Sequence, residues 1–167
     1  MSRRVLVLFA ATRDPEAALM ASLGPDPRIA LEQLESDGPI DVVTFWTPRT
    51  PLPFTGEVLA LADGRRPLTD RVLTALGLMR LRDALARYPA GRLLNSLGPA
   101  DASRVFWRTL RSRPDAMALA DAGTVVIAAD LAATLAARRL LDRGRAHRAV
   151  WTIRAGIDAV NGSGDVG

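Results

Sequence analysis

The amino-acid sequence predicts a three-layer α/β fold of the Rossmann-like, doubly wound kind, with about four parallel strands and helices on both faces of the sheet. Short aliphatic and β-branched runs alternate along the chain with segments of helical periodicity, which is typical of parallel β-α-β crossovers. The apolar runs are also continuous, as expected for strands that are buried on both faces. Because such crossovers are right-handed, a doubly wound sheet is the default arrangement.

Four apolar runs are predicted to form the strands. They cover residues 4–10 (RVLVLFA), 40–46 (IDVVTFW), 123–129 (GTVVIAA) and 149–153 (AVWTI). The segment 47–67 contains four prolines and little periodicity, so we expect a long loop that is functional or mobile. This loop begins at the C-terminal end of a strand, which is where open α/β sheets bind ligands.

Capping residues and Pro/Gly breakers divide the rest of the chain into helices. The predicted helices cover 15–23, 28–36, 68–88, 90–97, 102–112, 114–120 and 131–143, with a last helical turn within 154–160. Apolar residues cover most of the circumference of the 68–88 helix, which predicts that it packs between layers, on a protein partner or on a second copy. In the 131–143 helix, one apolar face is predicted to pack on the sheet, and it consists of Ala133, Ala136, Ala137, Leu140 and Leu141.

Length and composition indicate one globular domain over residues 1–160, followed by a flexible tail over 161–167. The 22 basic residues are all arginine, and the formal net charge is +4. This bias matches a GC-rich genome of the actinobacterial type, so we do not treat it as functional evidence. Acidic residues are interleaved with the arginines, whereas a nucleic-acid binder concentrates positive charge on one face, so nucleic acid is not an expected partner.

Several function classes are excluded by what the sequence lacks. The chain has no cysteine, which excludes disulfides, thiol catalysis and zinc–thiolate sites and agrees with a cytoplasmic location. The apolar run at 5–11 is too short and too soon followed by charge for a secretory signal, and no stretch has the ~20 apolar residues of a membrane span. The single histidine, His147, is expected on the surface opposite the cleft, so no histidine triad or metal site is predicted.

The candidate ligand-binding residues are those that the predicted strands bring to the C-terminal edge of the sheet. They are Thr12, Arg13, Asp14, Trp46, Arg49 and Asp130. The loop AATRD at 10–14 has neither a G-x-G-x-x-G fingerprint nor a P-loop, so no NAD, FAD or ATP cofactor is predicted, and no catalytic residue is assigned.

Each of these residues has a structural and a functional interpretation. Asp130 ends a strand where a helix begins, so it is a helix cap, a ligand contact or both. Thr12 and Arg13 either hold an anion at a helix N-terminus or form a simple turn. Trp46, with Arg49 nearby, either stacks on a sugar or base or closes the core.

A further cluster of arginines lies on the predicted 102–112 helix and just beyond it. Its members are Arg104, Arg108, Arg111 and Arg113, with Trp107 among them. Three of these arginines share a helical face, where they either bind a phosphate or an acidic partner or form a solvated surface.

Residues 120–153 resemble the N-terminal half of GT-B glycosyltransferases of the family-4-like type. An Ala-Asp pair at 120–121, a buried strand that ends at Asp130, an alanine-rich helix at 132–141 and a short strand at 150–153 occupy the corresponding places. The segments RVLVLF and DVVTFW are compatible with the same domain. The family's donor-binding C-terminal domain has no counterpart in this sequence.

The resemblance implies an acceptor-side domain or partner subunit that is not catalytic alone, with a sugar or nucleotide-sugar as its ligand. Two other readings of the sequence stay open. One is a stand-alone α/β enzyme that binds a small molecule or nucleotide. The other is a structural or interaction protein without enzymatic activity.

Overall fold

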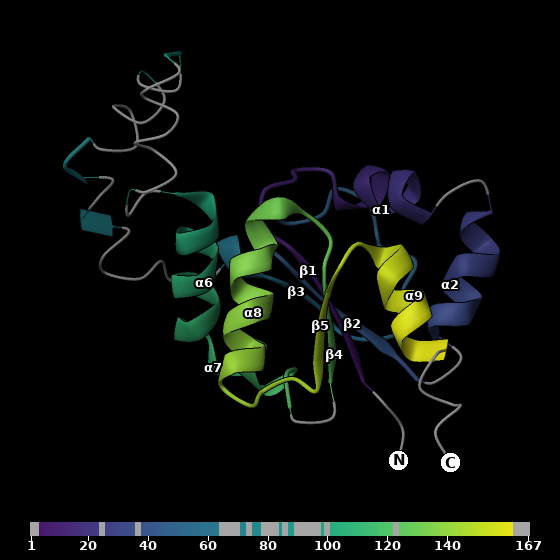
Figure 1. Ribbon diagram of the computed structural model, residues 1–167. Coiled ribbons are helices and arrows are strands. Elements are labelled where there is room, and N and C mark those ends of the chain that lie inside the picture. The colour runs from purple at the N-terminus through teal and green to yellow at the C-terminus, as the bar shows by residue number, and fades with distance from the viewer. Residues whose placement is uncertain are drawn as a thin grey trace.

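The computed structural model describes residues 4–23, 26–35, 38–63, 71–72, 75–77, 84, 87–88, 98, 101–121 and 124–161. A five-stranded sheet lies at its centre, with the strand order β3-β2-β1-β4-β5 (Figure 1). The strands are β1 (Val5–Phe9), β2 (Ile40–Thr44), β3 (Val58–Ala60), β4 (Val125–Ala128) and β5 (Arg148–Trp151). All neighbouring pairs are parallel, so the predicted α/β fold is confirmed.

β1 is the central strand of the sheet. Its middle residue, Val7, pairs with Val42 of β2 on one side and with Ile127 of β4 on the other. All five of its residues are buried. A continuous aliphatic run without polar alternation is therefore explained by helices that cover both faces of the strand.

The helices form two layers around the sheet. One layer holds α1 (Pro15–Leu23), α2 (Pro27–Glu35) and α9 (Ile153–Asn161), which contact one another. The other holds α6 (Ala102–Ser112), α7 (Pro114–Ala118) and α8 (Thr134–Asp142), together with the 3-10 helix η2 (Leu131–Ala133). A second 3-10 helix, η1 (Leu61–Asp63), follows β3. Figure 1 shows α6 and α8 side by side, with α9 and α2 across the sheet from them.

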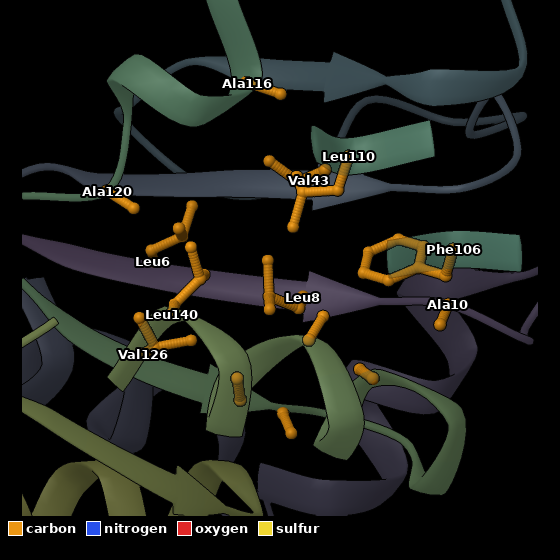
Figure 2. Close-up of a cluster of buried hydrophobic side chains, with 14 of the residues drawn as sticks. Leu6, Leu8, Ala10, Val43, Phe106, Leu110, Ala116, Ala120, Val126 and Leu140 are labelled. Carbon is orange, nitrogen blue, oxygen red and sulfur yellow. The ribbon is translucent and has the colours of Figure 1, made fainter. Parts of the chain in front are cut away.

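Alternate residues of the strands supply two apolar cores. Leu6 and Leu8 point to the α6/α8 layer, where they meet Phe106 and Leu110 (Figure 2). Val5, Val7 and Phe9 point to the α1/α2/α9 layer. Successive side chains of a strand point to opposite faces of the sheet, so one short apolar run contributes residues to both cores.

The structure departs from the sequence predictions in three elements. The predicted loop 47–67 contains the fifth strand, β3, whose three residues are too few to form a recognisable pattern. The predicted last helical turn within 154–160 is a nine-residue helix, α9. Leu141 is 41% exposed, because it lies at the margin of the apolar stripe, whose other four members, Ala133, Ala136, Ala137 and Leu140, are buried as predicted.

Some predictions fall outside the described residues. They include most of the 68–88 helix, all of the 90–97 helix and the tail beyond 161. The partner role of the 68–88 helix therefore stays a prediction. Among the helices that the structure describes, none is long and apolar enough to cross a membrane.

Candidate functional site

The parallel sheet brings most of the predicted site residues to one edge. Thr12, Arg13 and Asp14 follow β1, Trp46 follows β2, and Asp130 follows β4. Because β1 lies between β2 and β4, the loop after β1 lies between Trp46 and Asp130. The C-terminal ends of the strands therefore form the candidate ligand-binding edge.

Asp130 is a structural link between β4 and β1. Its Oδ1 accepts a hydrogen bond from the Ala133 N–H at 2.9 Å, which caps η2 as the sequence predicted. Its Oδ2 accepts two more, from the N–H groups of Ala10 and Ala11, each at 2.8 Å. A carboxylate has about four acceptor positions, so three of those on Asp130 are already occupied by the backbone of this chain.

Asp14 and Thr12 occupy the N-terminus of α1. The Oδ1 of Asp14 accepts a hydrogen bond from the Ala17 N–H at 3.0 Å. The Thr12 hydroxyl accepts from the Asp14 N–H at 3.2 Å and donates to the Asp14 carbonyl at 3.0 Å. The sequence analysis considered an anion bound at the N-terminus of this helix, which is the positive end of the helix dipole. In the structure, the carboxylate of Asp14 occupies that position.

Trp46 is held between an arginine and the core. The guanidinium of Arg13 lies over its ring, with Cζ 5.0 Å from the ring centroid. Phe45 meets the same ring edge-on, with centroids 5.1 Å apart, and Phe45 itself packs on the α6/α8 core. Trp46 is half-buried and Arg13 is exposed, so both present surface at the edge. Arg49, predicted beside Trp46, is an exposed residue of the same loop.

The loop between β2 and β3, residues 45–57, is hydrogen-bonded to both α1 and α2. The Thr50 hydroxyl donates a hydrogen bond to Glu16 of α1. The N–H and hydroxyl of Thr55 both donate to Glu35 of α2, each at 3.1 Å. Buried Leu52 joins the core between these two ties. This part of the predicted loop is therefore anchored to the α1/α2 layer.

Three residues at the other end of the same edge escaped the sequence analysis. Leu131, at the start of η2, is 87% exposed, and Trp151, the last residue of β5, is 60% exposed. Thr152 follows with φ +86°, in the left-handed region that β-branched residues rarely adopt. The run 149–153 predicts a buried strand, but β5 is an edge strand, and its pairing on one side only leaves Trp151 in contact with solvent.

A buried hydroxyl also lies at this edge. Thr44, the last residue of β2, is 1% exposed, and its Oγ1 has no hydrogen-bond partner in the structure. An unpaired buried hydroxyl costs free energy of folding, about 1–3 kcal/mol in protein mutational data.

The arginine cluster predicted on α6 lies on the opposite layer from α1. Arg104 and Arg111 are exposed, whereas Trp107 is buried, with the guanidinium of Arg143 4.7 Å from its ring centroid. Trp107 is thus a core residue and not part of an exposed binding surface. Arg113, the last member of the cluster, donates a side-chain hydrogen bond that lowers the pKa of Asp115 below its usual 3.8.

Within the residues that the structure describes, no three histidine, aspartate or glutamate side chains come together as a metal-binding group. His147 is exposed at the start of β5, at the amino end of the sheet and away from the candidate edge. No protein-family model, curated protein or solved structure matches this chain. The fold and the edge define a Rossmann-like α/β domain, and its function has to be argued from the edge itself.

Proposed function

We propose that the chain is a glycosyltransferase-like, acceptor-side domain that binds a sugar at the candidate edge and needs a partner for catalysis. The proposal is based on which groups at the edge are already bonded within the chain and which present surface. The backbone N–H groups suited to a phosphate hold the chain's own carboxylates, whereas the exposed guanidinium of Arg13 and the half-buried indole of Trp46 stack on each other and both present surface at the edge.

A nucleotide's phosphates fit this edge poorly. In a doubly wound sheet, a pyrophosphate is held by the backbone N–H groups after the first strand and by the following helix N-terminus. Here Asp130 accepts from Ala10 and Ala11 after β1, and Asp14 accepts from Ala17 in α1. A phosphate at this place has to displace or approach two carboxylates, and like charges at short range repel.

A sugar matches what is left exposed. The faces of sugar rings carry C–H groups that pack on an aromatic ring, and their hydroxyls accept hydrogen bonds from a guanidinium, which has five N–H donors. Arg13 and Trp46 are already in contact with each other, and Phe45 fixes the indole from the core side. Such a preformed pair loses little side-chain entropy when a ligand binds.

The same geometry supports the need for a partner. The edge carboxylates Asp14 and Asp130 hold backbone groups in place, and the single histidine lies at the other end of the sheet. We therefore propose that this domain positions an acceptor, and that a separate domain or subunit binds and activates the donor.

The proposal is tested by titrating the full chain with methyl glycosides of common hexoses and with UDP and GDP, followed by intrinsic fluorescence and calorimetry. We expect a methyl glycoside to bind, and Trp46→Leu and Arg13→Ala to weaken it at least tenfold. Arg148→Ala is the matched control, because Arg148 is exposed at the amino end of the sheet. Binding of UDP or GDP in preference to every glycoside would overturn the proposal and favour a nucleotide-binding enzyme.

A further inference from the structure

The lateral edge of the sheet, formed by β5, carries the net positive charge of the protein on an open strand. We propose that this lateral edge is a docking surface for a second protein, which adds an extended segment of alternating acidic and apolar residues beside β5. The inference goes beyond the proposed function and does not depend on the sugar site.

The first argument is the open backbone of β5. This strand is the last in the strand order, and it pairs with β4 on one side only. Figure 1 shows β5 between α8 and α9, both of which contact it. On its other side, the N–H and C=O groups have no strand partner within the part of the chain that the structure describes. A strand edge of this kind is a template for pairing with another extended chain.

The second argument is the distribution of charge. Residues 138–158, from the end of α8 through β5 into α9, contain six of the 22 basic residues and two of the 18 acidic residues. This segment therefore has a formal net charge of +4, which equals that of the whole chain, and the rest of the chain has equal numbers of both signs. All six basic residues are exposed, and they are Arg138, Arg139, Arg143, Arg145, Arg148 and Arg154.

The third argument is that the arginines nearest β5 lack a counter-charge. Arg138 pairs with Asp142 at 3.9 Å, and the guanidinium of Arg143 lies over Trp107 of α6. Three other arginines lie on β5 or within three residues of its ends, and among the described residues they form no ion pair; they are Arg145, Arg148 and Arg154. Unneutralised cations around an open strand favour a partner that is acidic.

The fourth argument is the alternation of side chains along β5. Ala149 packs on the α6/α8 core, and Val150 packs on the opposite core. Alternation therefore places Arg148 on the α9 side of the sheet and the 60% exposed Trp151 on the α8 side. Arg154 belongs to α9 itself. A strand added beside β5 alternates in the same way, so acidic residues on one of its faces meet the arginines and apolar residues on the other meet the indole.

A second copy and a nucleic acid fit this lateral edge less well. Two copies that pair through β5 bring together two segments of net charge +4, and like charges repel. A nucleic acid neutralises arginines, but it has no peptide backbone to complete the hydrogen bonds of a strand edge. The open strand and its charge together therefore favour an acidic, extended peptide segment.

The test measures fluorescence anisotropy of labelled hexapeptides with the full chain. The probes are a peptide of alternating glutamate and valine, the same peptide with lysine in place of glutamate, and the glutamate peptide with every backbone nitrogen methylated. We expect the glutamate peptide to bind and the other two to bind at least about tenfold more weakly, because one reverses the charge and the other removes the backbone donors.

Charge reversal on the protein locates the binding surface. Arg148→Glu and Arg154→Glu should each weaken the glutamate peptide about tenfold. Arg28→Glu is the matched control and should leave binding unchanged, because Arg28 is exposed on α2, outside the 138–158 segment. Amide hydrogen exchange gives a second measurement, in which the bound peptide should slow exchange within 148–151.

Four results would overturn the inference. Equal affinity of the methylated peptide would assign binding to charge alone, without strand addition. Tighter binding of a labelled single-stranded hexanucleotide, lost in Arg148→Glu, would assign the surface to nucleic acid. Self-association in analytical ultracentrifugation that Arg148→Glu changes would assign it to a second copy. No binding of the glutamate peptide would mean that the arginines only keep this strand from pairing with other chains.

Discussion

At the centre of the candidate edge the carboxylates are bonded within the chain, whereas at its two flanks aromatic side chains have exposed surface. At the centre, after β1 and β4, the carboxylates of Asp14 and Asp130 are bonded to backbone N–H groups of the same chain. At the flanks, after β2 and β5, Trp46 and Trp151 present aromatic surface. Asp130, the first candidate ligand contact in the sequence, thus links β4 to the loop after β1, and the aromatic side chains with exposed surface lie beside it.

This contrast teaches that the place of a residue at a C-terminal edge does not by itself make it a binding residue. The number of acceptor positions already used by the protein decides how much is left for a ligand. The following variants test the contrast between the centre and the flanks by one measurement, the free energy of unfolding in urea.

The largest effect is expected from breaking the centre. Asp130→Ala removes the acceptor for three backbone N–H groups, so we expect a loss of about 3 kcal/mol. Asp14→Ala is the matched comparison, because it removes a single capping bond and should cost only about 1 kcal/mol. Equal losses for the two variants would show that the bonds from Ala10 and Ala11 contribute nothing to stability.

A smaller effect of the opposite sign is expected at the end of β2. Thr44→Val replaces an unpaired buried hydroxyl with a methyl group of similar shape, and we expect a gain of about 1 kcal/mol. Urea unfolding measures the gain, with Thr109→Val as the control, because the Thr109 hydroxyl donates to the Val105 carbonyl at 2.9 Å. Destabilisation by Thr44→Val would mean that the hydroxyl has a partner, such as a bound water.

The exposed apolar side chains of the edge, Trp151 on the flank and Leu131 beside Asp130, should contribute little to folding. Trp151→Ala and Leu131→Ala remove side chains that are mostly in solvent, so we expect each to change stability by less than about 1 kcal/mol. If either variant unfolds the protein, its side chain is part of the core, and for Trp151 the contrast between centre and flank then fails.

The smallest effect is expected far from the edge, at the exposed pair of Arg113 and Asp115. The pKa of Asp115 is lowered in the folded state, chiefly by the hydrogen bond from Arg113, so its ionised form favours folding. This contribution is present above the unfolded pKa and is lost as the pH falls below 3.8 through the folded value. Asp115→Asn should cost about 0.3 kcal/mol at pH 7, a figure reduced for solvent screening, and progressively less as the pH falls below 3.8. A cost that does not decrease with falling pH would assign the effect to packing.

The parts of the fold that sequence analysis predicted depend on local signals. The continuous run of β1 predicted a buried strand, and α6 covers the predicted range 102–112, with Asp101 capping its N-terminus. The capping role of Asp130 is local too, because its partner Ala133 is three residues away. Its bonds to Ala10 and Ala11 span 120 and 119 residues, and they follow only from the placement of β1 beside β4.

The features of the edge that sequence analysis missed depend on how the strands pair. The contact of Arg13 with Trp46 depends on the register of β1 and β2, in which Phe9 pairs with Thr44. Trp151 lies in an apolar run that looks like a buried strand, and only the strand order shows that this run forms an edge. Three residues in β3 are too few for any pattern to be recognised.

The central position of the first strand has a consequence for how the protein folds. β1 pairs with β2, which begins 35 residues later, and with β4, which begins 120 residues later, because these strands start at residues 5, 40 and 125. During synthesis from the N-terminus, one side of VLVLF therefore stays unpaired until most of the chain has been made. An open, apolar strand edge of this kind is a template for aggregation. Nascent chains that stall before residue 125 should be the most dependent on chaperones.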